Sequence, residues 1–327
     1  MTTVRAAYID RLGPAAAIRY GDLPTPHPGP TDVLVDVVAT TVNHVDTFVR
    51  SGAFRTHVPL PFVVGRDLVG VVARSGDGVA EFHAGDRVWC NSLGHGGRQG
   101  AAAQRVVVPA DRLYHLPAEA SAEAVTVLHP AATAYLALAV HGRLRPGETV
   151  VVGGGGGNVG TALITLAVAL GGRVVATAAP RDETFCRSAG AAEVIDYAAP
   201  DLGERLSAAC PEGIGIYLDT SGTNDLDLVV GRLAARGRIV LLAGARTRPV
   251  LPVGDLYMMD RSIVGFVISH ATTAELAEAA GAVNRLLAAG RLNPREVVRF
   301  PLSEMAKVHQ MVEDGEMRGR RALVVPG

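Results

Sequence analysis

The residues at 149–160 constrain the fold of this chain more than any other stretch. Three valines at 150–152 form a β-branched run, and five glycines follow them at 153–157. From residue 161 to residue 170 the apolar side chains recur at helical spacing. Because a short β-branched run is typical of a buried parallel strand, this stretch predicts a strand, a glycine turn and a helix.

Within this stretch, Gly155, Gly157 and Gly160 match the pattern G-x-G-x-x-G. Glycine at these positions allows a tight turn, a close approach of the backbone to a pyrophosphate, and close helix–strand packing. The amides and dipole of the first helical turn then hold the phosphates. A glycine-rich loop without a ligand is the simpler alternative, but the flanking strand and helix favour a dinucleotide site. We expect that site to use Gly155, Gly156, Gly157, Asn158, Val159 and Gly160.

Strands and helices alternate through the rest of the second half of the chain. The expected strands are 150–152, 173–176, 193–195, 214–218, 238–243 and 263–268, and the expected helices are 158–170, 182–189, 201–209 and 224–235. Residues 123–140 read as a helical stretch before them, which Pro130 is expected to break. The alternation predicts a doubly wound parallel sheet whose ligand lies at the carboxyl ends of the strands.

The first 125 residues are predicted to be mostly β. Strand-like runs occur at 5–9, 32–38, 68–73, 87–89 and 105–108, with glycine turns between several of them. Many short strands at this spacing indicate a compact, barrel-like domain. The tail from residue 273 is expected to hold two helices, at 273–289 and 303–313, and two strands, near 297 and at 321–325. The fold class is therefore α/β, with one β-rich part and one doubly wound part.

Charge and composition exclude several classes of function. The formal net charge is −1, so the basic surface of a nucleic-acid binder or a membrane-surface protein is not expected. No run of about 18 apolar residues is present, and residues 1–10 do not resemble a signal peptide. The three cysteines are scattered and form no Cys-x-x-Cys pair. A reduced, cytoplasmic setting is the expectation.

Several further motifs accompany the glycine turn. They are Val42–Phe48, Gly65–Gly70, Gly85–Val88, Thr133–Tyr135, Gly237–Val240 and Gly319–Arg320. Together they resemble the medium-chain dehydrogenase/reductase superfamily, in particular its zinc-independent quinone oxidoreductase branch, which includes zeta-crystallin. The resemblance covers nearly the whole chain. It implies a GroES-like catalytic domain at 1–125, completed by 267–327, and a Rossmann NADP-binding domain at 126–266.

The resemblance also bears on metal binding. In the zinc-dependent relatives, a Cys, a Gly-His-Glu and a later Cys or His supply the catalytic ligands. Asn43 stands at the first Cys place and Arg66 at the His place, and the cysteine quartet of the structural zinc lobe is missing. An amide and a guanidinium do not make a zinc site, which requires thiolate, imidazole or carboxylate. We therefore expect no metal.

The cofactor choice depends on the end of the strand at 173–176. An NAD-preferring site usually places an acid there, but this strand ends in alanines, and Arg181 follows. That arrangement favours NADP(H), with Arg181 facing the 2′-phosphate. The alternative is that Arg181 is a solvated helix-start residue, with Asp182 and Glu183 weakening its field. The resemblance adds the cofactor-binding residues Thr133, Thr177, Tyr197, Thr223, Gly244, Ala245, Arg246, Phe266, Val267, Ile268 and Arg320.

Three neighbouring residues are the catalytic candidates. Asn43 offers an amide to the substrate oxygen or to the cofactor ribose, although a turn residue is its plainer interpretation. Asp46 is expected mainly to hold the loop, and His44 and His129 are possible proton donors. The resemblance assigns the substrate pocket to Phe48, Phe54, Ala102 and His129. Zinc-free relatives often carry Tyr at the two Phe positions, so the pocket should be apolar and lack a phenol.

Three functions stay open at this point. The first is an NADPH:quinone oxidoreductase, and the second is an enoyl or enone reductase of a biosynthetic pathway. The third is a protein that binds NADPH for sensing or for a structural role. The residues 248–254 and the strand after them are expected to pair edge to edge across a two-fold axis, giving a homodimer.

Overall fold

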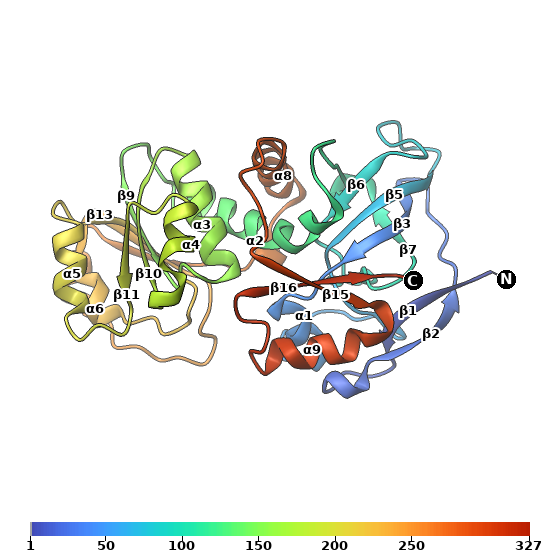
Figure 1. Cartoon of the computed structure of the whole chain (residues 1–327), viewed down its shortest axis with the longest axis horizontal. Coiled ribbons are helices and arrows are strands. Elements are labelled where there is room, and N and C mark those ends of the chain that lie inside the picture. Colours follow the sequence, from blue (N-terminus) through green and yellow to red (C-terminus); the bar gives the residue numbers. More distant parts are fainter. Residues whose placement is uncertain (1) are drawn as a thin grey trace. The chain divides into compact units, whose positions relative to one another are not determined.

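The computed structural model describes residues 2–327 (Figure 1). The chain divides into two compact units, one formed by residues up to 129 with 272–327, and the other by 130–271. The domain boundaries expected from the sequence, at 125/126 and 266/267, lie a few residues away and stay a proposal. The two units share no sheet, and each has its own core.

The first unit is built on two sheets. Its strands are β1 (Thr3–Ile9), β2 (Arg19–Pro24), β3 (Asp32–Thr40), β4 (Phe62–Val63), β5 (Leu68–Ser75), β6 (Arg87–Cys90), β7 (Arg105–Pro109), β8 (Tyr114–His115), β15 (Glu296–Pro301) and β16 (Arg320–Val325). The larger sheet has the order β15-β16-β3-β5-β6-β8, with β7 also paired to β3. The smaller sheet has the order β2-β1-β4. Strand β2 ends at Pro24 on a sheet edge, where a missing amide costs no ladder bond.

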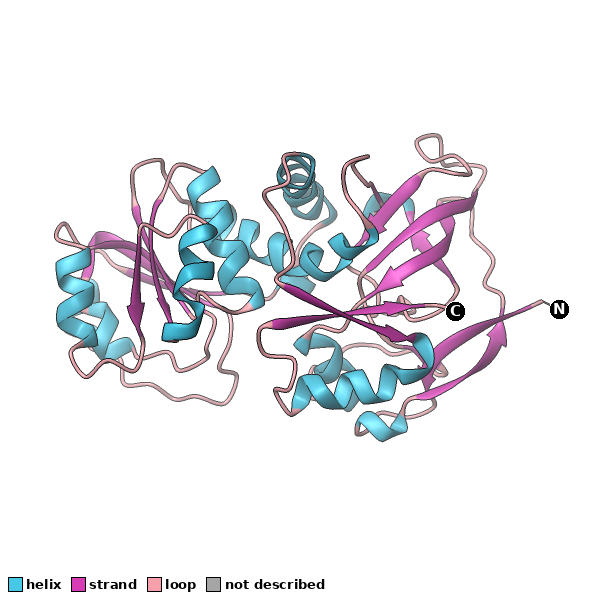
Figure 2. Ribbon diagram, viewed as in Figure 1, coloured by secondary structure: helices cyan, strands magenta, loops and turns pink. Residues whose placement is uncertain are grey.

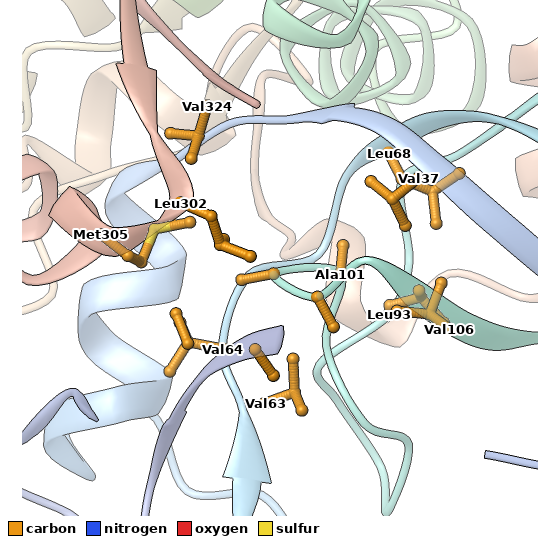
Figure 3. Close-up of a cluster of buried hydrophobic side chains, with 14 of the residues drawn as sticks. Val37, Val63, Val64, Leu68, Leu93, Ala101, Val106, Leu302, Met305 and Val324 are labelled. Atoms are coloured by element: carbon orange, nitrogen blue, oxygen red, sulfur yellow. The ribbon is translucent and has the colours of Figure 1, made fainter. Parts of the chain in front are cut away.

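Residues from both ends of the chain meet in the core of this unit (Figure 3). Val37 and Leu68 come from the central strands, and Val324 comes from β16 at the end of the chain. Leu302 and Met305 also come from the last residues of the chain, and both are buried. The β-rich half and the C-terminal tail therefore bury their apolar faces against each other.

The helices of the first unit are α1 (His44–Ser51), α8 (Thr273–Ala288) and α9 (Met305–Glu313), with 3-10 turns at Ala15–Ala17, Ala110–Arg112, Ala122–Ala124 and Leu302–Glu304. Both α1 and α8 begin at a capping box. Helix α1 was not predicted from the sequence. Asn43 is the N-cap of α1. The Asp46 carboxylate accepts a hydrogen bond from the backbone N–H of Asn43, as in a capping box. Gly52, with φ 82°, ends the helix.

The second unit is a parallel sheet with helices packed against it (Figure 2). Its strands are β9 (Thr149–Gly153), β10 (Arg173–Ala178), β11 (Glu193–Asp196), β12 (Ile214–Asp219), β13 (Leu233–Leu241) and β14 (Ser262–Gly265). Its helices are α3 (Asn158–Ala169), α4 (Glu183–Ser188), α5 (Leu202–Ala209), α6 (Leu226–Val230) and α7 (Val253–Tyr257), with 3-10 turns at Pro180–Asp182 and Ile268–His270. The strand order is β11-β10-β9-β12-β13-β14. This architecture confirms the expected α/β class.

Pro130 does not break its helix, contrary to expectation. Helix α2 runs over Val125–Tyr135 and continues as a π-helical turn at Leu136–His141. Its side chains are buried on nearly all sides, so tertiary packing outweighs the one lost hydrogen bond. The whole helical stretch Ala122–His141 is apolar and long enough to cross a membrane by composition, but 72% of its most apolar window is buried inside the protein. It is therefore a core helix.

Two other expectations were wrong in detail. The helix expected at 224–235 is only α6, because β13 already begins at Leu233, where it pairs with Ile214. A non-local strand partner overrides the local helical pattern there. The strand expected at 263–268 ends at Gly265, opposite the last residue of β13, Leu241. Without a partner to pair with, the chain turns at Ile268–His270 instead.

Candidate functional site

The glycine turn after β9 is a tightly packed bend that a side chain would disrupt. A Cβ on Gly160 would lie 2.1 Å from the carbonyl oxygen of Gly154, and one on Gly155 would lie 3.0 Å from the Cβ of Ala176. Gly154 has φ 76°, a conformation that L side chains rarely adopt. These positions therefore require glycine for structural reasons that match a dinucleotide turn.

The open side of the turn fits a pyrophosphate. Gly157 is the N-cap of α3 and is exposed, and Asn158 and Val159 are half-exposed at the first helical positions. The first amides of a helix have no partner within the helix, and its dipole favours an anion there. The residues present thus fit the diphosphate of a dinucleotide.

Loops after neighbouring strands converge on this turn. The Gly155 amide donates to the carbonyl of Thr177, at the end of β10. The hydroxyl of Thr220, just after β12, donates to the carbonyl of Gly153 at 2.7 Å. The carboxyl ends of β9, β10 and β12 therefore meet here, as expected for a ligand site of a parallel sheet.

Asp219, which the sequence analysis missed, organises the loop after β12. It is buried and accepts from the Ser221 amide at 2.7 Å, the Ser221 hydroxyl at 2.6 Å and the Asn224 amide at 2.6 Å. The Ser221 hydroxyl in turn lies 3.1 Å from the hydroxyl of Thr223, which is exposed. The signal for Asp219 in the sequence was its place as an acidic residue directly after the strand expected at 214–218.

The residues after β10 differ in how they face the turn. The Arg181 side chain is 74% exposed, and Tyr197 is also exposed. The Asp182 side chain is only 15% exposed, and a Cβ on Gly156 would lie 2.6 Å from its Oδ2. Asp182 is therefore packed directly against the glycine turn, while Arg181 points into solvent.

The other segments assigned to the cofactor lie along the end of the same sheet. Phe266 stacks on His141 with ring centroids 4.4 Å apart and an interplanar angle of 21°. Ile268 is buried and Val267 half-buried. Gly244 adopts φ 86°, and Ala245 and Arg246 after it are exposed. Thr133 is buried on α2.

Five side chains of the first unit form a buried polar cluster: Asn43, Asp46, Arg66, Asp67 and His129. All of them are at most 9% exposed. The amide Nδ2 of Asn43 donates to Asp67 Oδ2 at 2.9 Å, and Arg66 Nε donates to Asp46 Oδ1 at 3.2 Å. His129 Nδ1 lies 3.9 Å from Asp67 Oδ1. The cluster thus joins the start of α1, the residues before β5, and α2.

Burial sets the charges within the polar cluster. It raises the pKa of Asp67 well above its usual range, and the nearby Asp46 carboxylate adds to that rise. Burial also raises the pKa of Asp46, but Arg66 opposes the rise, so Asp46 is the anion that pairs with the guanidinium. The cation of the cluster is therefore paired with one carboxylate, and Asp67 is the carboxyl whose charged form burial disfavours more strongly.

His129 is held neutral. Burial and the nearby Arg66 lower the pKa of its ring to about 3. Nδ1 lies 3.4 Å from the carbonyl oxygen of Asn91, which places the proton of the neutral ring on Nδ1. The ring therefore holds its only proton toward a backbone carbonyl, and we no longer propose it as a proton donor.

The remaining candidates of the first unit are spread along its surface and core. His44 and Phe48 are exposed on α1, and Phe54 is half-buried with its ring 5.6 Å from that of His95. Ala102 is fully buried, and its amide and carbonyl bond to Val64 and Ala7. It packs as a core residue, so we leave it out of the proposed pocket. Arg320 lies at the start of β16 and donates to the carbonyl of Glu316.

Metal ligands are not grouped in the part of the chain that the structure describes. Within residues 2–327, no three His, Cys, Asp or Glu side chains are arranged to hold a metal ion. Arg66, at the place of a zinc-binding histidine in the zinc-dependent relatives, forms an ion pair with Asp46. A guanidinium at that place repels a divalent cation.

Two family models match the chain. Residues 29–118 match the alcohol dehydrogenase GroES-like domain, and residues 158–285 match the zinc-binding dehydrogenase model. The mouse quinone oxidoreductase is 29% identical over 93% of this chain and 92% of its own length. A mycobacterial protein complexed with NADPH has a TM-score of 0.84 at 27% identity, over 99% of this chain and 100% of its own. An NAD-dependent alcohol dehydrogenase has a TM-score of 0.87 at 29% identity, over the same shares of the two chains.

These matches cover both units and agree with the glycine turn, the parallel sheet and the β-rich unit that the C-terminal tail completes. The chain belongs to the medium-chain dehydrogenase/reductase superfamily, as an oxidoreductase of the quinone oxidoreductase type.

Proposed function

We propose that this chain transfers hydride from NADPH to a quinone or a similar conjugated carbonyl compound, without a metal ion. The observation that carries the proposal is the buried polar cluster around Asn43, in which Arg66 pairs with Asp46, at the place where the resemblance puts the catalytic zinc ligands. A bound nicotinamide supplies the hydride, and the glycine turn of the second unit fits its diphosphate. The quinone oxidoreductase relatives support the same substrate class.

Asn43 is the residue we propose to touch the substrate or the cofactor ribose. One N–H of its amide is donated to Asp67, and the amide oxygen takes part in the capping box of α1, so the second N–H is the group that we propose for a ligand. Asp67 fixes the amide, and Asp46 holds the backbone of the same residue. The group is thus positioned by two buried partners, as a binding group must be. Phe48 and Phe54 supply the apolar surface of the proposed pocket.

The type of acceptor follows from the charge of this site. A neutral amide stabilises developing negative charge far less than a divalent metal does. A quinone or an enone spreads the charge over a conjugated system and depends less on such stabilisation. The enoyl or enone reductase therefore remains the second candidate function. It requires in addition a proton donor, which we propose to be solvent water or His44 on the exposed face of α1.

NADPH is the proposed donor because Arg181 is exposed beyond β10, where a 2′-phosphate of the cofactor would lie. The NADPH complex of the mycobacterial relative supports this choice. Tyr197 is the proposed neighbour of the adenine. The proposed residues of the nicotinamide side are Thr133, Gly244 and the segment 266–268.

A homodimer in the cytoplasm is the proposed state of the protein. Strand β14 is the edge of the parallel sheet. The segment before it exposes the large apolar residues Val250, Leu251, Val253, Tyr257, Met258 and Met259. An unpaired edge beside such a surface favours pairing with a second copy across a two-fold axis.

Steady-state oxidation of NADPH by a naphthoquinone, with an enoyl thioester in parallel, tests the function. We expect the quinone to be the fast acceptor, and a chelator to leave the rate unchanged. The variant Asn43→Ser keeps an N-cap oxygen and should leave the free energy of unfolding within about 1 kcal/mol of that of the wild type. Its kcat/KM should fall by about 100-fold, because the fixed amide is lost. Equal rates for Asn43→Ser and the wild type would mean that Asn43 only caps α1 and does not contact the substrate.

A further inference from the structure

Asp182 occupies an unusual place for an acid in this fold. Strand β10 ends at Ala178 without an acidic residue, and Asp182 follows four residues later, just before α4. Its carboxylate does not cap that helix. Instead it lies against Gly156, with a Cβ on that glycine only 2.6–2.8 Å from three of its side-chain atoms. The carboxylate beside the glycine turn is therefore that of Asp182, which lies four residues beyond the end of β10.

This position selects between the two forms of a dinucleotide. The glycine turn holds the diphosphate, and the adenine ribose lies beside it at the end of the second strand. A carboxylate accepts hydrogen bonds from the two ribose hydroxyls of an unphosphorylated cofactor. The same carboxylate repels a 2′-phosphate, and its low exposure limits the screening of that repulsion by solvent.

The basic groups nearby do not cancel this effect. Arg181 Nε lies 4.0 Å from Asp182 Oδ2, so the Asp182 carboxylate offsets part of the positive charge of Arg181. Arg187 is paired with Glu183 at 2.9 Å, on the exposed surface of α4. Arg181 is therefore the cation available to a 2′-phosphate, and it acts from a solvent-exposed position, where charges are worth little.

We propose that Asp182 binds the adenine-ribose hydroxyls of NADH, so that the chain uses NADH as well as NADPH. This proposal rests on the dinucleotide site of the proposed function and deepens it. In this proposal the solvent-exposed Arg181 favours NADPH, and the half-buried Asp182 beside the glycine turn favours NADH. Removing the charge of Asp182 should turn a protein of mixed preference into one that prefers NADPH.

Binding, measured without any acceptor, tests the proposal. Dissociation constants for NADH and NADPH are measured by fluorescence titration of the full chain, with AMP and 2′,5′-ADP as competing fragments. For the wild type we expect the two dissociation constants to agree within about tenfold. For Asp182→Asn we expect NADH and AMP to bind about fivefold more weakly or worse, and NADPH and 2′,5′-ADP to bind more tightly.

Three variants control the experiment. Glu183→Gln removes the neighbouring exposed carboxylate and should leave the preference unchanged, because that side chain faces Arg187. Arg181→Ala should weaken NADPH alone. Asp182→Ser repeats the loss of charge with a smaller side chain, in case the Asn variant packs poorly against Gly156.

The outcomes separate this inference from the proposed function. If Asp182→Asn and Asp182→Ser keep the wild-type ratio of NADH to NADPH affinity within twofold, the role of Asp182 is refuted and the dinucleotide site stands. If the wild type binds NADPH more than about tenfold more tightly than NADH, the proposed mixed preference is refuted. If the wild type binds neither dinucleotide, the proposed function fails together with the inference.

Discussion

The ion pair between Arg66 and Asp46 offers the sharpest test of the first unit. Both side chains are almost completely buried, at 2% and 3% exposure, and Asp67 lies in the same cluster. The variant Arg66→Met removes the cation and keeps an apolar stem of similar length. It leaves the Asp46 carboxylate in a buried site without its counter-ion.

The expected cost follows from that burial. Breaking a buried ion pair by removing one partner costs about 3–5 kcal/mol, because the remaining charge is uncompensated. Without Arg66, the pKa of Asp46 in the folded protein rises further, since burial already raises it. A raised carboxyl pKa penalises folding fully above that pKa, and the penalty shrinks as the pH falls through it, until it is gone below the pKa of the unfolded chain. The cost should therefore shrink by up to about 1.4 kcal/mol per pH unit as the pH falls through that window.

The chain supplies its own probe for this measurement. Trp89 is the one tryptophan of the sequence, is buried in the first unit, and donates to Asn284 of the same unit. Urea unfolding followed by its fluorescence therefore reports on that unit, although the whole chain need not unfold in one step. The matched control is Arg105→Met, because Arg105 pairs with Asp36 at 46% exposure of both side chains.

The control should cost at most about 1 kcal/mol and should respond little to pH. Equal costs for Arg66→Met and Arg105→Met at pH 7 would contradict the reasoning. So would a cost of Arg66→Met that grows on acidification.

Three further outcomes can be measured on single variants. Gly160→Ala should weaken NADPH binding by about tenfold or more in a fluorescence titration, because its Cβ would lie 2.1 Å from the Gly154 carbonyl oxygen. Gly254→Ala, whose Cβ meets nothing within 4 Å, should bind as the wild type does. Burial lowers the pKa of His309 to about 3, so the unfolded chain takes up a proton below pH 6.5 that the folded protein refuses. The variant His309→Leu should therefore gain stability over the wild type by up to about 1.4 kcal/mol per pH unit below 6.5, measured by urea unfolding at pH 8 and pH 5. Met258→Asp, at a 70% exposed position, should convert the proposed dimer to a monomer by light scattering.

The second unit could be predicted largely from the sequence because its signals are local. The valine run, the glycines and the helix of the dinucleotide turn lie within about twenty residues, and the structure places them as β9, the turn and α3. The errors occurred where a distant partner decides the conformation. Leu233 looked helical by its spacing, yet it pairs with Ile214. Helix α1 was missed although its capping residues, Asn43 and Asp46, were in view.

The polar cluster shows the limit of sequence reasoning more clearly. Asn43 and Arg66 drew attention because they stand at the places of zinc ligands in related enzymes. Their buried partner Asp67 carried no signal of its own, since an acid before a strand is usually a solvated turn residue. His129 comes from α2, and only the fold brings its ring to 3.9 Å from Asp67. Burial then reversed the expected chemistry of that ring, from proton donor to a neutral, fixed group.

The charge of this cluster limits the reactions we expect of the protein. A zinc ion would place a net positive charge beside the substrate oxygen, whereas the Arg66 cation is paired with Asp46, and burial raises the pKa of Asp67 well above its usual range. Reduction of a simple ketone builds a localised alkoxide, and in the proposed site Asn43 would offer that alkoxide one hydrogen bond. Reduction of a quinone or an enone builds a delocalised anion, which needs less stabilisation of its negative charge by the protein. We therefore expect conjugated acceptors to react, and saturated ketones and aldehydes to fail even when they bind.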